Sequence, residues 1–361
     1  MKARLLFALA LALALTACAA DQPGATPASA TAGSVHFVVA IQGDMSVKRL
    51  GWSAYAPASF GMILRDGDLV RLDGPSQATV ACSDLTVSTS RAGVSSVPCK
   101  VSKPVLVYGN SLIVPTRADA PLLDIPIVLA PRKTKVLAER PIVRWAAVSG
   151  ASTYSVTVRG PNLNWSGSVT GKTETVYPDN APPLAAGQSY KVSVSAGART
   201  SDQETTPGLG FTVLKADEAQ AVRAGEERIR RLGLSDAATR LLLANLYASL
   251  GLNADAIDLM ESLARSSHEP TILRSLGDLY LKVSLNRMAE ERYVQALDLA
   301  QKANDTEGQA AANNALGLVY ESMGNKADAI QRSLNAVEWY QKLGDNKTIK
   351  QIQDRLAALQ R

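Results

Sequence analysis

The chain has 361 residues, enough for roughly two or three domains of ordinary size. Hydrophobic residues make up 46% of the chain and charged residues 20%, so it can bury cores and is not globally disordered. Its two histidines, His36 and His268, lie far apart in the sequence, and it has three cysteines. These counts exclude a multi-histidine metal centre and a four-thiolate zinc site, and we expect no metal or other cofactor.

Residues 1–17 have the features of a secretory signal peptide. Lys2 and Arg4 make a short basic start, and Leu5–Leu15 is an apolar run. That run is shorter than the ~20 residues that span a bilayer, as is typical of a signal sequence. The chain is therefore expected to be exported.

The signal ends in Leu-Thr-Ala-Cys at residues 15–18, which resembles the lipobox of bacterial lipoproteins. The resemblance implies cleavage before Cys18 and a diacylglycerol thioether on its sulfur, with acyl chains anchoring the protein to a membrane. In enteric bacteria, Ala19 at the next position would imply sorting to the outer membrane. The alternative is an ordinary signal peptide cleaved near Ala17 or Ala20. Residues 18–33 are small, polar and rich in Pro, Gly, Ser and Thr, which predicts a flexible tether.

Residues 34–107 are predicted to form a β domain. Val35–Ile41 is an apolar strand pattern followed by a turn, and Ser46–Arg49 continues as a second strand. The segment Gly61–Asp68 has the spacing Gly-x-x-Leu-x-x-Gly-Asp. Gly67 can take the positive φ of a tight turn there, and Asp68 can accept backbone hydrogen bonds within it.

This combination resembles the FecR-like domain, which implies a small β-sandwich or β-roll. Signalling members of that family carry a cytoplasmic anti-sigma segment and a transmembrane helix before the domain. We find neither in this sequence, so the signalling role is not carried over.

Cys82 and Cys99 remain once Cys18 carries the lipid. Two cysteines in an exported domain predict a disulfide, which would stabilise the domain by ~3 kcal/mol. The alternative is a pair of free thiols in a host without oxidising enzymes. A redox-active pair is disfavoured because the two lack Cys-x-x-Cys spacing.

Residues 108–214 are predicted to contain a linker and a second β domain. Strand patterns occur at Pro141–Trp145 and Thr153–Val158, and Leu-x-x-Gly-x-x-Tyr at residues 184–190 matches a tyrosine corner. The segment resembles a fibronectin type III or immunoglobulin-like sandwich. The resemblance implies a buried Trp145 with Tyr154 opposite it. Trp165 is either partly buried or an exposed loop aromatic able to stack on carbohydrate.

Residues 215–361 are predicted to be all-helical, because proline almost disappears and a pattern repeats. Small and large residues recur at the same offsets in three units, which begin at Leu243, Leu276 and Leu316. Each unit starts as Leu-(Ala/Gly)-x-x-Tyr, and the pattern matches the tetratricopeptide repeat, a pair of antiparallel helices. The steps of 33 and 40 residues imply longer helices before the third unit. Gly251 and Gly324 are expected to end helices.

Apolar spacing also predicts an amphipathic helix at each end of the array, as solenoids require caps. The fold class is therefore multidomain, two all-β modules followed by an all-α repeat solenoid. Family geometry places a concave partner-binding face on the first helix of each unit. Carried onto this sequence, that face comprises Asn245, Arg274, Asp278, Lys282, Asn314 and Glu321. The alternative is that these are ordinary solvated helix positions.

No Gly-x-Ser-x-Gly, Ser-x-x-Lys, P-loop or Gly-x-Gly-x-x-Gly motif indicates catalysis, and we predict no catalytic residues and no enzyme. A dense basic patch is also lacking, so nucleic acid is not an expected partner. The leading hypothesis is a membrane-anchored scaffold that binds another envelope protein through its repeats, while the β modules hold the repeats away from the membrane. One alternative is that the β modules bind glycan or peptidoglycan, which an exposed cluster of Trp52, Tyr55 and Trp165 would favour. Another alternative is that the protein senses the state of the envelope.

Overall fold

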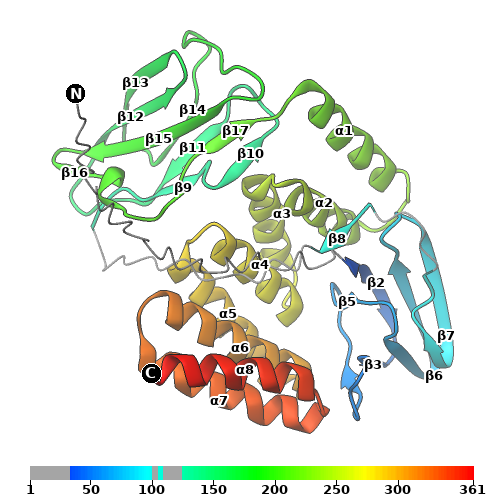
Figure 1. The fold of residues 1–361 in the computed structure, drawn as a ribbon. Coiled ribbons are helices and arrows are strands. Elements are labelled where there is room, and N and C mark those ends of the chain that lie inside the picture. Colours follow the sequence, from blue (N-terminus) through cyan, green and yellow to red (C-terminus); the bar gives the residue numbers. More distant parts are fainter. Residues whose placement is uncertain (1–32, 100–104, 109–123) are drawn as a thin grey trace, which may run out of the picture.

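The computed structural model describes residues 33–99, 105–108 and 124–361. The predicted signal peptide, the predicted lipidation site Cys18 and most of the predicted tether lie outside the described residues. Three parts follow one another along the chain, namely a first β module (33–108), a second β module (124–214) and a helical array (216–361) (Figure 1). In the described ranges, none of the helices is both long and apolar enough to cross a membrane.

The first β module is built on one antiparallel six-stranded sheet. Its strands are β2 (His36–Gln42), β3 (Met45–Lys48), β4 (Ala56–Pro57), β5 (Ile63–Leu64), β6 (Leu69–Ala81) and β7 (Val87–Ser96). The order is β4-β3-β6-β2-β5, and β7 pairs with β6. A small ribbon of β1 (Gly33–Ser34) and β8 (Val107–Tyr108) joins the ends of the module.

The first four residues of β2, His36–Val39, are buried on both faces of the strand, which explains the run of apolar residues that follows His36. Val38 faces the module's own core, together with Val47, Val70 and Val80. The neighbouring Phe37 points the other way and joins a core that consists mainly of helical residues. The sheet is therefore covered on its second face by the helical array.

The second β module is the predicted two-sheet sandwich. One sheet has the order β14-β11-β9, and the other has the order β10-β17-β15-β12-β13 with β16 paired to β15. The strands are β9 (Val128–Ala130), β10 (Thr134–Val136), β11 (Ile142–Trp145), β12 (Thr153–Gly160), β13 (Leu163–Thr170), β14 (Glu174–Val176), β15 (Ser189–Ala196), β16 (Arg199–Thr200) and β17 (Phe211–Val213), with a 3-10 turn at Ser201–Gln203.

Two sequence expectations can be followed in the core of this sandwich. Trp145 is buried, with its ring centroid 5.3 Å from that of Tyr154. The Tyr190 hydroxyl accepts a 2.8 Å hydrogen bond from the backbone N–H of Ala185, as a tyrosine corner requires. Trp165 lies in β13 rather than in a loop, and its ring packs edge-on against Tyr177.

The helical array has eight described helices. They are α1 (Ala216–Arg230), α2 (Asp236–Leu250), α3 (Asn253–Ser266), α4 (Pro270–Lys282), α5 (Asn286–Lys302), α6 (Thr306–Ser322), α7 (Lys326–Leu343) and α8 (Asn346–Leu359). The pairs α2–α3, α4–α5 and α6–α7 are the three repeat units. Their small positions permit close approach, since a Cβ at Gly277 would lie 2.5 Å from the Tyr293 ring. Gly251 ends α2 with a positive φ of 82°.

The second and third repeat units are 40 residues apart instead of 33, and the predicted cause, longer helices, is what the structure shows. Helices α5 and α6 have 17 residues each, whereas α3 has 14 and α4 has 13. The additional residues therefore extend existing helices and do not form another element.

Single helices stand at the two ends of the array. The Tyr247 hydroxyl donates to Glu226 of α1 over 2.7 Å, and the Tyr280 hydroxyl donates in the same way to Glu261 of α3 over 2.5 Å. Burial and the neighbouring carboxylate raise the pKa of both tyrosines. Helix α1 thus stands where the second helix of a preceding repeat would lie, and α8 follows α7 as a further first helix.

The two β modules meet opposite ends of the repeat helices (Figure 1). The first module reaches the N-terminal ends of α4 and α6, where Ser59 bonds to Thr271 at 2.7 Å. The second module reaches the turns that follow α2 and α4, where the Lys135 N–H donates to the Gly251 carbonyl at 2.8 Å. The array is consequently held between two β modules.

Candidate functional site

The six residues predicted to line the concave face lie on α2, α4 and α6, the first helices of the three pairs. Three of them bond within the array. The Asn245 amide donates to the Leu241 carbonyl at 2.8 Å, and Asp278 accepts the Tyr293 hydroxyl at 2.7 Å. Lys282 is exposed, yet its Nζ donates to the Ala248 carbonyl at 3.0 Å.

Two further residues of this set are held by the closing helix. Arg355 of α8 donates from Nη2 to Asn314 at 2.9 Å and to Ser333 at 3.0 Å. Its Nε also lies 3.8 Å from a Glu321 carboxylate oxygen. Burial lowers the pKa of Arg355, and Glu321 partly offsets that shift. The face at the third repeat is therefore taken up by the chain's own last helix.

The sixth residue, Arg274, lies where the first β module approaches the array. It borders a small cavity together with Met62 of that module and with Asp305 and Glu307 at the start of α6. Burial raises the pKa of Asp305, and the charge of Arg274 acts in the opposite direction. Arg274 thus lies beside the first β module, and the six residues do not form one open site.

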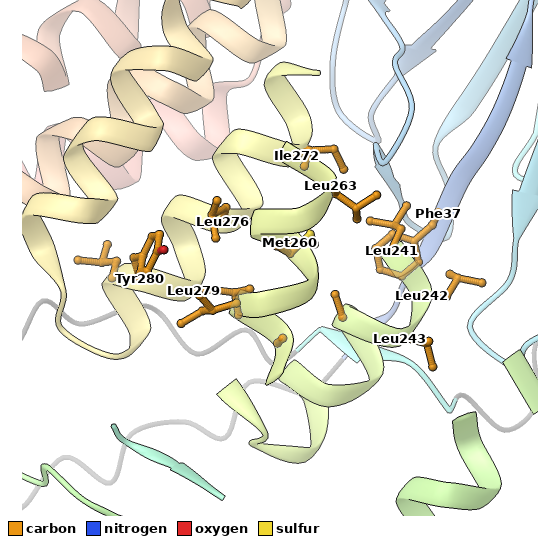
Figure 2. Packing of buried hydrophobic residues seen from close by; sticks show 14 of the residues in the cluster. Phe37, Leu241, Leu242, Leu243, Met260, Leu263, Ile272, Leu276, Leu279 and Tyr280 are labelled. Carbon is orange, nitrogen blue, oxygen red and sulfur yellow. The ribbon is translucent and has the colours of Figure 1, made fainter. Parts of the chain in front are cut away.

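This covering surface was not predicted from the sequence. Phe37 of β2 packs with Leu241 of α2 and Ile272 of α4 in a shared apolar core (Figure 2). All three are at most 1% exposed. The available signal was the continuous apolar run of β2, since a strand with one solvated face would alternate.

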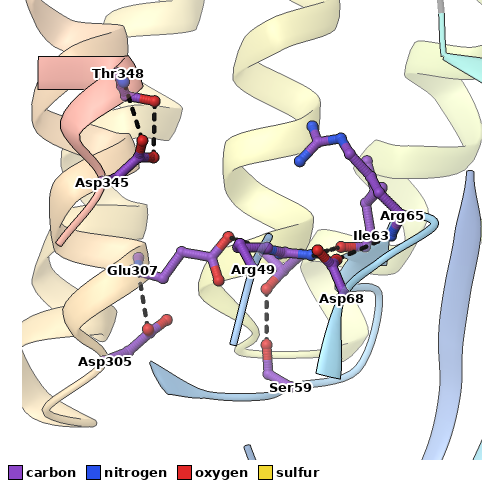
Figure 3. Close-up of polar contacts among 11 residues, drawn as sticks. Arg49, Ser59, Ile63, Arg65, Asp68, Asp305, Glu307, Asp345 and Thr348 are labelled. Atoms are coloured by element: carbon purple, nitrogen blue, oxygen red, sulfur yellow. Dashed lines mark hydrogen bonds and ion pairs between the residues drawn. The ribbon is translucent and has the colours of Figure 1, made fainter. Parts of the chain in front are cut away.

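A buried charge cluster joins the same two parts (Figure 3). Arg49 donates from Nη1 to Asp68 at 2.6 Å and from Nη2 to Glu307 of α6 at 2.7 Å. Burial alone would lower the pKa of Arg49, but the two carboxylates raise it above its ordinary value. Asp68 also accepts the backbone N–H of Arg65 at 2.9 Å, as expected for the Gly-Asp turn. The predicted motif therefore serves the module's docking as well as its turn.

The second β module is attached through Arg132, which is 2% exposed. Its guanidinium donates to Glu204 at 2.8 Å within the module and to the Val283 carbonyl of the array at 2.7 Å. Near Arg132, the side-chain amide of Asn253 in α3 donates to the Lys133 carbonyl at 2.6 Å. The attachment combines these hydrogen bonds to turn backbone with a small apolar cluster, in which Leu137 and Leu214 pack with Val222 and Leu252.

Cys82 and Cys99 are joined by a disulfide in the first β module. The buried His36 ring lies beside it, accepts the Ser83 N–H at 3.1 Å on Nδ1 and is 3.3 Å from Asp66 on Nε2. The histidine nitrogen and the two sulfurs lie within 4.8 Å of one another, a spacing that metal ligands can have. Because sulfurs bonded to each other are not thiolates, this donor set does not fit a metal ion.

The aromatic residues proposed for carbohydrate stacking are not gathered on one surface. Trp52 packs beside α6, α7 and α8, while the partly buried Trp165 packs against the core of the second module. Tyr55 lies between Arg71 at 4.5 Å and Lys48 at 5.5 Å from its ring centroid. The cluster that would favour glycan binding is therefore not formed.

Comparison with known proteins gave similarity to solved structures only. No protein-family model matches the chain, and no curated protein matches it. Crystal structures of BtubC (BKLC) from P. vanneervenii, of MamA and of YrrB, titled a TPR protein with an unusual peptide-binding site, each align with 40% of this chain. Identities are 23%, 23% and 19%, and TM-scores are 0.34, 0.29 and 0.24. The match spans 65%, 84% and 78% of those chains, just under two thirds for BtubC.

The fold class follows from the geometry already described. The chain has a β-rich N-terminal region followed by eight described helices in a tetratricopeptide-like solenoid.

Proposed function

We propose that this protein is a non-enzymatic, membrane-anchored lipoprotein of a bacterial envelope that binds another envelope protein through its repeats. The observation that carries the proposal is that each β module is bonded to one end of the repeat helices, so that the solenoid is held between them. A surface that is already ordered loses little conformational entropy when a partner binds, which favours affinity. Export and anchoring are inferred from the signal sequence and from Cys18.

We infer that the two β modules belong to the FecR-like and fibronectin type III-like groups that their sequences resemble. The strand order of the second module and its tyrosine corner support the latter assignment. In this proposal both modules position the solenoid, and neither carries catalysis.

The anchor is tested by replacing Cys18 with serine. In a bacterial host supplied with labelled palmitate, the unchanged protein should incorporate label and sediment with membranes. The Cys18→Ser protein should do neither. Membrane attachment that persists without label would contradict the lipoprotein proposal.

Docking is tested by crosslinking and pull-down from envelopes with the full-length protein. Lys282→Glu reverses an exposed charge on α4, and Lys302→Glu makes the same change on α5, where Lys302 pairs with Asp298. We expect Lys282→Glu to reduce capture of a specific protein and Lys302→Glu to leave it unchanged. Equal capture by both variants would place the docking surface elsewhere.

A further inference from the structure

Two cysteines and a histidine meet at one corner of the first β module, although they come from three different places in it. His36 begins β2, Cys82 directly follows β6, and Cys99 lies just beyond the end of β7. Backbone contacts hold two of these residues independently of the disulfide. The Cys82 N–H donates to the Thr86 carbonyl at 2.8 Å, and His36 is paired with Leu64 of β5. The corner is therefore framed by the sheet as well as by the bond between the sulfurs.

The hydrogen bonds of His36 arrange its ring as that of a metal ligand. Its Nε2 lies 3.3 Å from a carboxylate oxygen of Asp66, which can only accept, so Nε2 carries the proton of the neutral ring. Nδ1 keeps the lone pair, and it accepts the N–H of Ser83, the residue after Cys82, at 3.1 Å. A ligating histidine usually donates its other N–H to a carboxylate or carbonyl, which fixes the orientation of the ring. Asp66 already supplies that contact.

The surroundings of this corner are buried and contain an unsatisfied hydroxyl. His36 is 0% exposed and Cys82 is 1% exposed. The Ser83 hydroxyl is also buried and has no hydrogen-bond partner among the residues that the structure describes. A buried hydroxyl without a partner is unfavourable, and a water bound beside Cys82 would relieve that cost. Cys99 is only partly buried, so a reductant can reach the disulfide from its side.

We propose that reduction of the disulfide converts this corner into a binding site for one Zn²⁺, held by Cys82, Cys99 and Nδ1 of His36. In the oxidised protein the sulfurs are bonded to each other and cannot ligate. A dithiol reductant breaks that bond by exchange. Its two thiols become a disulfide, and two electrons and two protons pass to the two cysteines. Zinc binding then releases both protons, because the thiolate is the ligand.

The spacing and the chemistry of the donors suit zinc. Zn–S bonds of ~2.3 Å place two sulfurs of a tetrahedral site about 3.8 Å apart, and the three donor atoms here lie within 4.8 Å of one another. Thiolate and imidazole ligands select zinc over Mg²⁺ and Ca²⁺, which prefer oxygen. Three protein ligands leave a fourth position for a water.

A bound zinc would link the same two positions of the chain as the disulfide. Leu85, three residues after Cys82, and Phe37, next to His36, belong to the core that the module shares with the helices. A metal link between the cysteines therefore keeps this part of the shared core in place in the reduced protein. The inference is independent of any partner of the repeats.

The test uses the full-length chain carrying Cys18→Ser, in which Cys82 and Cys99 are the only cysteines. The protein is reduced with dithiothreitol, separated from it without oxygen, and titrated with Co²⁺, a coloured substitute for zinc. We expect one equivalent of Co²⁺ to produce a thiolate-to-cobalt charge-transfer band, and one equivalent of Zn²⁺ to remove it. The oxidised protein should show no band. A reduced, folded protein without the band would overturn the proposal.

The role of the histidine is tested by zinc competition against the cobalt signal. His36→Gln should weaken zinc binding at least about tenfold, and Asp66→Asn should weaken it about tenfold through the orientation of the ring. His268→Gln is the matched control, since His268 is exposed in the helical array, and it should leave the affinity unchanged. Equal affinity of the His36→Gln and control proteins would show that the site is not the one proposed.

Because His36 is buried, its variant can fail to fold, so zinc is also tested with the histidine intact. Saturating Zn²⁺ should slow alkylation of the reduced Cys82 and Cys99 by iodoacetamide about tenfold or more, because a ligated thiolate is protected. It should also raise the urea midpoint of the reduced protein and leave that of the oxidised protein unchanged. If zinc changes neither quantity, the two cysteines form a disulfide only and the proposal is wrong.

Discussion

The two β modules contact the same helical array in different ways. The first module shares an apolar core with the helices, into which Val35, Phe37 and Val39 project. The second module closes a core of its own and touches the array through polar groups such as Arg132 and through a small apolar cluster around Leu214. A sheet with an uncovered apolar face needs another layer to bury it, whereas a complete sandwich does not. The first module is therefore part of one cooperative unit with the helices, and the second is an attached domain.

The energies of the two attachments should differ accordingly. Burial of a large apolar side chain stabilises by about 1.5–3 kcal/mol, and a net hydrogen bond by about 0.5–1.5 kcal/mol. The first module adds a buried charge cluster to its apolar contact. Mutations at the two contacts can separate these contributions.

The largest expected effect comes from Phe37→Ala in the shared core. The truncation should lower the free energy of unfolding by about 3–5 kcal/mol, measured by urea denaturation. It should also speed amide exchange in α2 and α4, which contact Phe37. Phe211→Ala in the second module is the matched control and should cost a similar amount without changing exchange in those helices. Unchanged exchange in α2 and α4 after Phe37→Ala would mean that the shared core is not cooperative.

Removal of Arg49 should have a comparable or slightly smaller effect. Arg49→Met leaves Asp68 and Glu307 buried without their cation, which should cost about 3–5 kcal/mol in guanidinium denaturation. Adding Glu307→Met should recover at least about 1 kcal/mol, because one stranded charge disappears. Further destabilisation by the second substitution would show that Glu307 has another essential role.

The disulfide should stabilise the first module and the helical array that packs against it, and it should not stabilise the second module. It closes a loop with a sequence separation of 17 residues. Replacing both Cys82 and Cys99 with serine should lower the free energy of unfolding by about 3 kcal/mol. Calorimetry should locate this loss in the transition of the first module and the array. A loss confined to the second module's transition would contradict the shared-core interpretation.

The exposed ion pairs of the second module should matter little. Arg144 pairs with Asp258 of α3, and Lys135 pairs with Glu218 of α1, all with partly exposed side chains. Arg144→Met and Lys135→Met should each cost less than about 1 kcal/mol, with a further decrease in high salt. A cost near that of Arg49→Met would remove the distinction drawn between the two attachments.

The smallest effect is a pH dependence at the second contact. Burial, aided by the nearby Asp258, raises the pKa of Asp255 to about 6. A carboxyl group whose pKa is higher in the folded protein than in the unfolded chain takes up its proton more readily when folded. Stability should therefore fall as pH rises from about 4 to about 6. Asp255→Asn should abolish that fall and gain less than about 1 kcal/mol at pH 7, because the side chain keeps contact with solvent. Urea titrations at several pH values measure both effects.

Features that depend on local spacing were predictable. The three repeat units, their stops such as Gly251, and the Tyr190 corner each depend on residues within one or two elements. The six predicted binding positions lie on the expected helices, but their predicted role assumed an open face. Intramolecular partners such as Arg355 and Met62 come from parts of the chain that a repeat pattern does not include.

By itself, the sequence determined that β modules precede a capped helical repeat array, because periodic burial and turn residues leave a signature in neighbouring positions. The export signal stays a prediction from the sequence. Only the tertiary structure decided how the parts assemble. Arg49 and Glu307 are separated by 258 positions, and a single pair at such a distance produces no periodicity. The same holds for Trp52 and Ala56, whose apolar side chains would suit a module's own core as well as the helices against which they pack.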